Sequence, residues 1–444
     1  MGENMVEIKR DFIKYVSLNV MSMIALSCYI LGDTYFVAKG LGGEGLAALN
    51  FSISVYSILN GFGLMIGIGG GTDYSLTQHK EGEGNRSFSH AVFIGGCAAL
   101  VFVLMGIFFT EPLSNVLGAE GATLPLTVTY LRTILLAAPF FIFNNISLAY
   151  IRNDNNPKLP MIAMITSSFS NIVLDYVFMF VFGWGMFGAA FATSLSPVIS
   201  LLILSKHFRT QAGFKWIKTK ISLNRIFAMA SYGFSSFIVE IASAVSLITF
   251  NLIIMNIRGT IGVGAYGIVA NIALIETAVF VGISQGIQPL ASRSFSLGKK
   301  TDLKFIFRAS WITAAIVIIL CYGIVFFFAE EIGMLFNSQG DPELLGLAVE
   351  GLRIYFIGYF FAGFNIVTIA YLSAVLKTKE GMFLSILRSI AILIPMVFIL
   401  QEYFKMRGAW LSFVFTEGIV FLIMMGIFYS AKRNRKERKT ADEI

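Results

Sequence analysis

The stretch Cys28-Tyr29-Ile30-Leu31-Gly32-Asp33-Thr34-Tyr35-Phe36-Val37 places a single carboxylate, Asp33, inside a run apolar enough to cross a lipid bilayer. An aspartate in the middle of a transmembrane helix costs roughly 2.5 to 3.5 kcal/mol even on the lower insertion scales, so such residues usually face a bundle interior or a water-filled cavity. Either Asp33 has a function inside the membrane, or it lies near a helix end and reaches water. We favour the first interpretation, because intramembrane ionisable residues are functional by default.

The composition predicts an integral membrane protein. The chain has 444 residues, of which 56% are hydrophobic and only 13% are charged, and it contains 43 phenylalanines. A soluble core cannot bury that much apolar surface. The net charge of +7 would suggest a nucleic-acid partner in a soluble protein, but here we expect no nucleic acid, because the position of the charges matters more than their sum.

The cysteines and the N-terminus give two further expectations. Cys28, Cys97 and Cys321 lie in apolar runs without a CxxC spacing, so we expect neither a metal site nor a disulfide, and we interpret them as small packing residues. Residues 1–11 are polar and lead into a full-length span without a small-residue cleavage site. This pattern argues against a removable signal peptide, so the first span stays in the membrane.

Windows of about 20 predominantly apolar residues predict twelve transmembrane helices. The first six are Phe12 to Ala38, Leu46 to Gly71, Ala91 to Phe109, Leu126 to Ile151, Leu159 to Val181 and Phe187 to Ser205. The second six are Ile226 to Ile257, Gly264 to Leu290, Phe305 to Phe328, Ile354 to Leu376, Met382 to Leu400 and Ala409 to Tyr429.

The basic residues support this count and orient the chain. Of the 33 Lys and Arg residues, 27 fall in the N-terminus, the C-terminal tail and alternate loops, including the linker between the sixth and seventh spans. The remaining six lie on the opposite side, where the segment from Glu330 to Glu350 is acidic. Since basic residues collect in cytoplasmic loops, we expect both termini in the cytoplasm and the protein in the cell membrane.

An internal repeat divides the chain into halves. Residues 131–150 align without gaps onto 352–371, with seven identities in twenty positions at an offset of 221. At an offset of 219, Gly45, Gly63 and Gly67 fall on Gly264, Gly282 and Gly286, and the spacing of these glycines is typical of close helix packing. Each repeat holds six spans, so the halves share one orientation, and we expect two six-helix lobes related by a pseudo-two-fold axis along the membrane normal.

The expected organisation has four parts. They are an N-lobe at residues 1–207, a basic cytoplasmic linker at 208–224, a C-lobe at 225–430 and a basic cytoplasmic tail at 431–444. In the linker, Phe214-Lys215-Trp216-Ile217-Lys218-Thr219-Lys220-Ile221 alternates apolar with basic residues. A segment that lies on an anionic leaflet has this pattern, and a charged tether that obeys the positive-inside rule explains it equally well.

Six acids fall within or at the ends of the apolar runs: Asp33, Asp73, Asp175, Glu240, Glu276 and Glu417. Asp73 follows a glycine cluster at a cytoplasmic helix end, where we expect it to reach water. Asp175 lies one helical turn after Asn171, so the two side chains share a face, and Thr193 on the next span could add a hydroxyl. Such oxygen donors suit a proton or a small cation. The alternative is that Asn171 and Asp175 only join neighbouring helices.

In the second half, Glu240, Glu276 and Glu417 would make the C-lobe attractive to cations if they all point inward. The alternative for each is a protonated carboxyl bonded to a neighbouring helix. We find neither a nucleotide-binding loop nor a catalytic or metal-ligand spacing, so we expect no enzyme and no cofactor. No Lys or Arg lies in the middle of a predicted span.

The chain resembles the multidrug and toxic compound extrusion (MATE) transporters, in the MepA-like or DinF-like branch, over essentially its whole length. The residues that carry the resemblance are Gly32 to Ala38 followed by Gly45 to Leu49, Arg152 to Lys158, Asn171 to Asp175, and Gly282 to Leu290 with Gly298 to Lys300. The resemblance implies twelve helices in two lobes around a central cavity. It implies an ion-coupling site at Asp33, Asn171, Asp175 and Thr193, with Tyr29 and Tyr130 as hydrogen-bonding neighbours, and substrate-cavity candidates at Glu240, Glu276, Glu417, Asn144 and Asn365.

Two departures from the family pattern bear on mechanism. Members often have a proline early in the first span, whereas Tyr15 to Val20 here has none. Some members place a carboxylate in the tenth span, where this chain has Asn365 between two apolar residues. The first departure argues against a proline-kink mechanism, and the second favours the N-lobe as the coupling site.

The sequence thus predicts a monomeric secondary antiporter that exports amphipathic, often cationic drugs in exchange for protons or sodium, with membrane lipids around it. The alternative is a lipid-linked saccharide flippase with the same fold. A flippase for anionic substrates would be expected to line its cavity with Arg or Lys.

Overall fold

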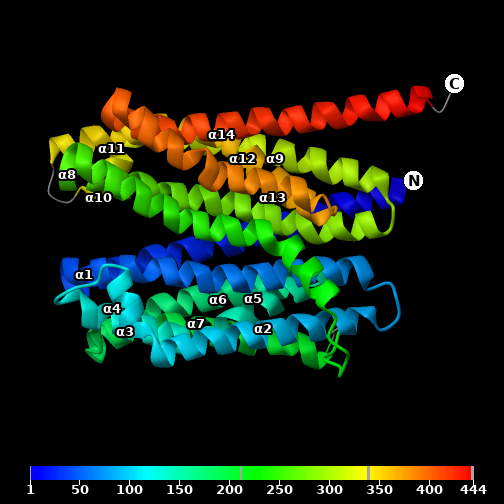
Figure 1. The fold of residues 1–444 in the computed structure, drawn as a ribbon, viewed down its shortest axis with the longest axis horizontal. Helices are drawn as coiled ribbons and strands as arrows, with labels where there is room; N and C mark the ends of the chain where they lie inside the picture. Colours follow the sequence, from blue (N-terminus) through cyan, green and yellow to red (C-terminus); the bar gives the residue numbers. More distant parts are fainter. Residues whose placement is uncertain (1, 211–212, 338–340, 442–444) are drawn as a thin grey trace. The chain divides into compact units, whose positions relative to one another are not determined.

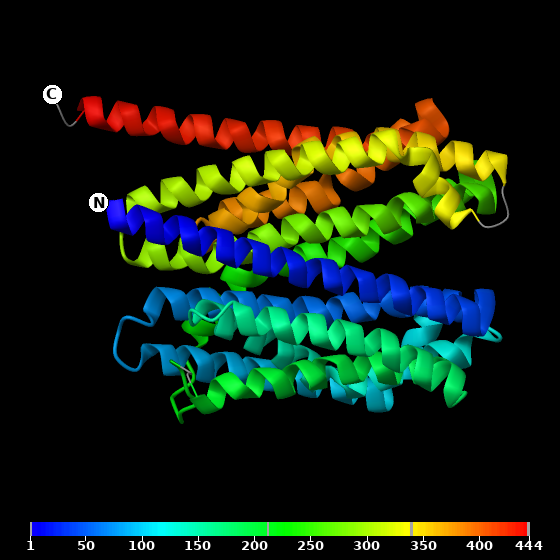
Figure 2. The ribbon, with the colours of Figure 1, turned by 180° about the vertical axis from the view of Figure 1, so that it is seen from behind.

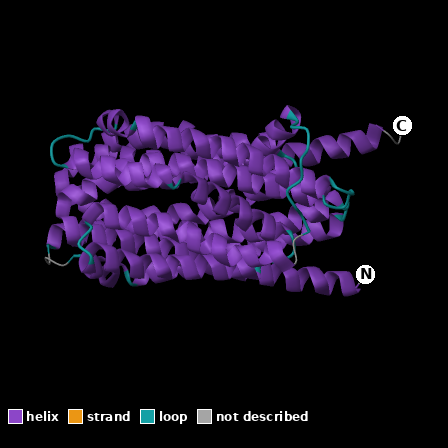
Figure 3. Cartoon of the chain, turned by 90° about the horizontal axis from the view of Figure 1, so that it is seen from below, coloured by secondary structure: helices purple, strands orange, loops and turns teal. Residues whose placement is uncertain are grey.

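The computed structural model describes residues 2–210, 213–337 and 341–441, and these ranges are almost entirely helical (Figure 1). None of the described residues lies in a β-strand, and only short loops and turns join the helices (Figure 3). The all-α prediction is therefore confirmed. Residues 442–444 of the predicted tail lie outside the described residues.

The helices of the first half are α1 (Gly2–Thr77), α2 (Glu83–Phe108), α3 (Thr110–Val116), α4 (Thr123–Leu136), α5 (Ala138–Asn153), α6 (Lys158–Tyr176) with the π-helix η1 (Val177–Val181), and α7 (Gly185–Thr210). The second half contains α8 (Leu223–Ser296), α9 (Lys300–Phe327), α10 (Ala329–Phe336), α11 (Pro342–Tyr355), the 3₁₀-helix η2 (Phe356–Gly358), α12 (Tyr359–Ala374), α13 (Thr378–Ile386), the π-helix η3 (Leu387–Ala391) and α14 (Leu393–Ala441).

Three helices are each two helices joined at one residue with positive φ. The break lies at Gly42 in α1, with φ 63° and ψ −153°, and at Gly259 in α8, with φ 61° and ψ −150°. In α14 it lies at Lys405, with φ 53°. A continuous α1 of 76 residues would be about 110 Å long, far more than the roughly 30 Å of a bilayer core. Glycine provides the break in α1 and α8 because it has no Cβ to clash at positive φ.

Counting these breaks gives the number of spans. Nine described helical segments are long and apolar enough to cross a membrane, and α4 with α5, bent by 50°, form a tenth. Two of the nine, Met5–Thr77 and Thr378–Ser430, contain the breaks at Gly42 and Lys405 and are therefore two spans each. The prediction of twelve membrane-spanning helices is confirmed.

The internal repeat is visible in the helices themselves. Helices α4 and α11 both have 14 residues, and α5 and α12 both have 16. The breaks at Gly42 and Gly259 have nearly the same dihedral angles, and each comes between the first two spans of its half. These correspondences confirm two six-helix lobes, whereas the predicted symmetry axis stays a prediction.

By contacts, the chain separates into two units that do not end where the predicted lobes end. The first unit comprises residues 1–245, 277–308 and 370–378, and the second comprises 246–276, 309–369 and 379–444. The first unit thus contains α1 to α7 together with both ends of α8. The predicted lobe boundaries stay a prediction, because they follow the repeat rather than the contacts.

The exposed surface of the spans is largely apolar, as expected for helices that contact lipid. Large apolar side chains are strongly exposed along the spans, among them Phe108 at 67%, Leu202 at 68% and Leu422 at 70%. The cysteines are free, but Cys28 and Cys97 are exposed, so the expectation that all three serve as packing residues is wrong. In the membrane, lipid provides an apolar environment outside the bundle, and a small apolar residue gains little from facing inward.

Glycines allow helix backbones to approach one another within the first unit. A Cβ at Gly67 would lie 2.6 Å from the backbone carbonyl oxygen of Asn145. A Cβ at Gly63 would lie 2.8 Å from the side-chain amide nitrogen of the same asparagine. A Cβ at Gly282 or Gly286 would lie 2.6 or 2.8 Å from a Cα atom of α1. These contacts agree with the close packing predicted from the glycine spacing. Figure 2 shows this first part of α1, in dark blue, as one continuous helix.

Replacing Gly67 by alanine is expected to destabilise the protein. The added methyl meets backbone atoms that cannot move aside, and overpacking of this kind costs roughly 1 to 3 kcal/mol. Gly96 on α2 has no atom within 4 Å of the corresponding position, so Gly96→Ala is the matched control and should retain or raise the stability, since alanine favours helix. Melting temperatures of both purified variants in detergent test this. Equal melting temperatures would show that the contact at Gly67 is loose.

Candidate functional site

Four buried polar residues of the first unit form the candidate ion site. Asp33 comes from α1, Asn171 and Asp175 come from α6, and Thr193 comes from α7, and their exposed fractions are 7%, 0%, 0% and 3%. The two carboxylates are close enough to interact electrostatically. The structure therefore brings together the four residues that the sequence singled out.

The amide of Asn171 joins the site. In the orientation that satisfies both of its groups, its nitrogen donates to Oδ2 of Asp175 at 3.1 Å, and its oxygen accepts from the backbone N–H of Thr193 at 3.2 Å. The spacing of one helical turn between Asn171 and Asp175 makes the first contact possible. The amide thus fixes one oxygen of Asp175 and leaves the other for a further partner.

Two carboxylate oxygens in this site are buried and have no hydrogen-bond partner among the described residues. They are Oδ1 of Asp33 and Oδ1 of Asp175, whereas the hydroxyl of Thr193 lies beside that of Tyr130. A buried polar atom without a partner loses its interaction with water and gains nothing in return, so native proteins rarely leave one without a reason. A proton or a small cation between these oxygens would provide the missing interaction.

Tyrosines surround the carboxylates. Asp33 acts electrostatically on Tyr29, Tyr56 and Tyr130, and Tyr130 also interacts with Asp175. The hydroxyls of Tyr29 and Tyr56 are 3.4 Å apart. The sequence identified Tyr29 and Tyr130 but missed Tyr56. The available signal was a phenol in the middle of the second span, which needs a polar partner in lipid.

Donor chemistry limits which ions the site could hold. Among the described residues no three His, Cys, Asp or Glu side chains converge as a metal site would require. The site itself offers two carboxylates, one amide and one hydroxyl, which are hard oxygen donors. These groups fit a proton or a monovalent cation better than a transition metal.

Glu240 forms a separate polar chain with two asparagines. The amide nitrogen of Asn60 donates to Oε1 of Glu240 at 3.0 Å, and the amide nitrogen of Asn145 donates to Oδ1 of Asn60 at 2.9 Å. Glu240 also acts electrostatically on Tyr56, which faces Asp33 as well. The sequence did not identify Asn60 and Asn145. The adjacent candidate, Asn144, has a buried Oδ1 without a partner among the described residues.

Glu276 is 4% exposed, and both of its carboxylate oxygens are without hydrogen-bond partners in the described chain. The residue with which it interacts electrostatically is Cys321 on α9. Such a carboxyl is stable in an apolar environment when it is protonated. Glu276 is therefore a buried acid of the second unit whose carboxylate has no hydrogen-bond partner among the described residues.

Glu417 has a cationic partner that the sequence analysis did not foresee. Nε and Nη2 of Arg388 donate to Oε1 of Glu417 at 2.9 and 2.6 Å, and the amide nitrogen of Asn365 donates to its Oε2 at 2.8 Å. Arg388 lies in η3, ten residues after the first residue of α13. The expectation that no Lys or Arg lies in the middle of a span is therefore wrong. The guanidinium is tolerated there because the carboxylate neutralises it.

Asp73 is buried rather than hydrated. It is 7% exposed, and its Oδ2 accepts from Nε and Nη2 of Arg225 at 2.9 and 2.7 Å. Nη1 of the same arginine donates to Oε2 of Glu83 at 2.7 Å. The expectation that Asp73 reaches water is wrong, because α8 begins against the end of α1 and brings its guanidinium to this carboxylate.

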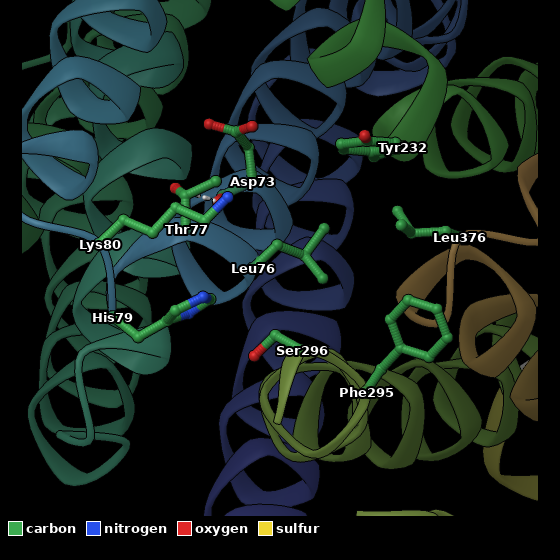
Figure 4. Close-up of a pocket in the computed structure, with 9 residues that line it drawn as sticks. All are labelled: Asp73, Leu76, Thr77, His79, Lys80, Tyr232, Phe295, Ser296 and Leu376. Carbon is green, nitrogen blue, oxygen red and sulfur yellow. Dashed lines mark hydrogen bonds between the residues drawn. The ribbon is translucent and has the colours of Figure 1, made fainter. Parts of the chain in front are cut away.

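Beside this ion pair lies a cavity of about 370 Å³ (Figure 4). The end of α1 and the turn after it, both ends of α8 and the turn between α12 and α13 line it. The lining residues are Asp73, Leu76, Thr77, His79, Lys80, Tyr232, Phe295, Ser296 and Leu376. Because Arg225 already neutralises Asp73, the cavity offers no free carboxylate.

Comparison with known proteins places this arrangement in a family. The MatE family model matches residues 19–177 and 235–399. Multidrug export protein MepA from Staphylococcus saprophyticus is 27% identical over 436 residues, which cover 96% of this chain and 94% of that protein. MepA from Staphylococcus aureus is 26% identical over 424 residues, which cover 94% of this chain and 92% of that protein.

Solved structures give the same fold. The outward-facing conformation of a multidrug resistance MATE family transporter of the MOP superfamily superposes with a TM-score of 0.89 at 20% identity, covering 97% of both chains. A MOP superfamily transporter from Pyrococcus furiosus, described as having a binding pocket of reversed polarity, superposes with a TM-score of 0.83 at 20% identity and covers 96% of both chains. Since the family model spans most of the sequence and the fold agrees throughout, the chain belongs to the MatE family of multidrug and toxic compound extrusion transporters.

Proposed function

We propose that this membrane transporter is a secondary antiporter that exports amphipathic, often cationic organic compounds in exchange for an inward-moving ion. The observation that carries the proposal is the pair of buried, unpartnered carboxylate oxygens on Asp33 and Asp175. Relatives that cover nearly the whole chain are named multidrug export proteins, which supports the substrate class.

The two carboxylates supply the coupling. Two anions near each other in a medium of low dielectric repel, so one of them binds a proton unless a cation lies between them. Ion binding therefore neutralises the site, and ion release restores the repulsion. A change of this kind favours different packings of α1, α6 and α7 in the loaded and empty states, which is what alternating access requires.

We favour protons over sodium. Asp33, Asp175, the amide of Asn171 and the hydroxyl of Thr193 include only two carboxylates, and without a third they form a weak cage for sodium. The first part of α1 is unbroken and contains no proline, so this helix cannot respond to protonation by bending at a proline kink. Movement of this helix would instead occur where Gly282 and Gly286 contact it.

The orientation and setting complete the proposal. We place both termini in the cytoplasm, because the basic residues collect at one end of the spans. We also place the chain in the plasma membrane, as a monomer. A flippase for anionic lipid-linked saccharides is less favoured. Arg388, a basic residue inside a span, is neutralised by Glu417 and is therefore not free to bind such a substrate.

Substituting Asp33 by asparagine should abolish uphill export. Asparagine keeps the size of the side chain but cannot lose a proton, so position 33 stays neutral and no longer repels Asp175. In proteoliposomes, a pH gradient or a sodium gradient imposed separately identifies the ion that drives the wild type. The variant is expected to insert and bind drug but to accumulate none above protein-free vesicles. Wild-type uphill rates in the variant would assign Asp33 a structural role and move the coupling to Glu240, Glu276 or Glu417.

Substituting Glu240 by glutamine should narrow the substrate range toward neutral compounds. The glutamine carbonyl can still accept the hydrogen bond from Asn60, so the substitution removes the charge and keeps the contact. Export of cationic drugs is expected to fall about tenfold relative to neutral drugs, a loss of about 1.4 kcal/mol, while ion-driven transport of neutral drugs continues. Asn60→Ala, which removes the contact and keeps the charge, is the matched control. An equal loss for cationic and neutral drugs would indicate a structural role for Glu240.

A further inference from the structure

The linker between α7 and α8 follows a fixed course over the first unit. Residues 213–222, here called the strap, contain no regular secondary structure and precede α8 (green in Figure 1). A solvated tether would make few contacts with the rest of the chain. The strap instead has its backbone and one aromatic side chain bound to the helices beneath it.

Side chains of the first unit clamp the backbone of the strap. The N–H groups of Gly213, Lys215 and Ile217 donate to carboxylate, amide and hydroxyl oxygens of Asp154, Asn85 and Ser89 at 2.7, 2.7 and 2.8 Å. At the far end, the N–H of Ser222 donates to Nε2 of His90 at 3.0 Å. The clamp therefore fixes which side of the strap faces the protein.

Phe214 anchors the beginning of the strap. Its ring is 1% exposed and lies within 4.7 to 5.6 Å, centroid to centroid, of the rings of Tyr74, Phe88, Tyr150 and Phe208. Burying a phenylalanine stabilises its position by roughly 1.5 to 3 kcal/mol. The residues that follow it are consequently held against the first unit and are not free to fold back.

Lys215 is exposed, and from Trp216 to Lys220 the side chains alternate between exposed and partly covered. Trp216, Lys218 and Lys220 are exposed, whereas Ile217 and Thr219 between them are partly covered. Trp216 is 63% exposed, which is unusual for so large an apolar ring unless it meets another surface. With the backbone clamped, this outward face is a preformed surface of one indole and several ammonium groups.

No acid balances these charges. Between Asp175 and Glu240 the sequence has no Asp or Glu. Within this stretch, the strap contains three lysines: Lys215, Lys218 and Lys220. The ion pairs found nearby engage Arg86, His207 and Arg225, and none of the three strap lysines pairs with a described carboxylate. The face is thus positively charged and available to an anionic partner.

The strap continues directly into a helix that faces lipid. Leu223 and Phe227, one turn apart at the start of α8, are 67% and 70% exposed on the outside of a membrane span. The strap residues immediately before them therefore adjoin the start of a candidate membrane span, and we place them at the membrane interface. Trp and Lys are the residue types that occupy this interfacial layer.

From these observations we propose that the strap is a binding surface for anionic phospholipids, in which Lys215, Lys218 and Lys220 contact the headgroups and Trp216 inserts at the interface. The partner is the membrane leaflet at which α8 begins, and binding needs neither substrate nor coupling ion. A lysine near an anionic surface strengthens the attraction to that surface roughly fivefold. The proposal is independent of the transported substrate.

Fluorescence quenching of Trp216 tests it in the full-length protein. Wild type is reconstituted into vesicles that contain equal mole fractions of brominated phosphatidylcholine or brominated phosphatidylglycerol, and the signal of Trp216→Phe is subtracted to isolate this residue among four tryptophans. We expect roughly fivefold stronger quenching by the anionic lipid, declining at high salt because salt screens exposed charges. In the triple variant Lys215→Gln, Lys218→Gln, Lys220→Gln, the ratio of quenching by phosphatidylglycerol to quenching by phosphatidylcholine should fall to about one.

The matched control is the triple variant Lys299→Gln, Lys300→Gln, Lys304→Gln, which changes the net charge equally without touching the strap. It should keep the wild-type ratio. The glutamine variant of the strap keeps its clamp, because Lys215 contributes only its backbone N–H. Equal quenching by the two lipids in wild type, no quenching by either, or an equal loss of preference in the control variant would each overturn the proposal.

Discussion

The constraint on which this structure depends is that the interior of a membrane protein, like the bilayer around it, contains almost no water to satisfy a polar group. Most polar side chains in the described spans meet this constraint locally. Ser27 and Ser52, for example, donate to carbonyl oxygens one turn earlier in their own helix. The buried oxygens Oδ1 of Asp33 and Oδ1 of Asp175 differ from these hydroxyls, because no donor among the described residues forms a hydrogen bond with them. An ion that comes and goes is the partner that a transport cycle would supply.

Sequence reasoning succeeded where one physical property acts along the chain. The length of apolar runs gave the twelve spans, and the one-turn spacing of Asn171 and Asp175 gave a shared helix face, because both depend only on helix geometry. The breaks at Gly42 and Gly259 fall between predicted spans for the same reason. Hydropathy and periodicity are local properties, and the chain reports them directly.

Sequence reasoning failed where a contact joins distant parts of the chain. The burial of Asp73 depends on Arg225, which follows it by 152 residues, and the neutralisation of Glu417 depends on Arg388 in the preceding span. Asn60 was missed because an asparagine in a span looks like any helix-joining amide until its partner, Glu240, is known. The exposed cysteines show the complementary error, since apolar surroundings in sequence do not distinguish a core position from a lipid-facing one.

The two halves of the repeat treat their acids differently, and this difference bears on where coupling resides. Asn144 and Asn365 occupy corresponding positions, yet Asn365 holds Glu417 together with Arg388, whereas no ion pair among the described residues engages Asp33 or Asp175 in the first half. Arg388 balances the charge of Glu417, so this pair needs no further cation. Two carboxylates that face each other without a cation repel, and an added proton or cation relieves that repulsion. The two similar halves thus place a cation beside Glu417 and, within the described chain, none beside Asp33 and Asp175, which is why we propose the first half as the place of coupling.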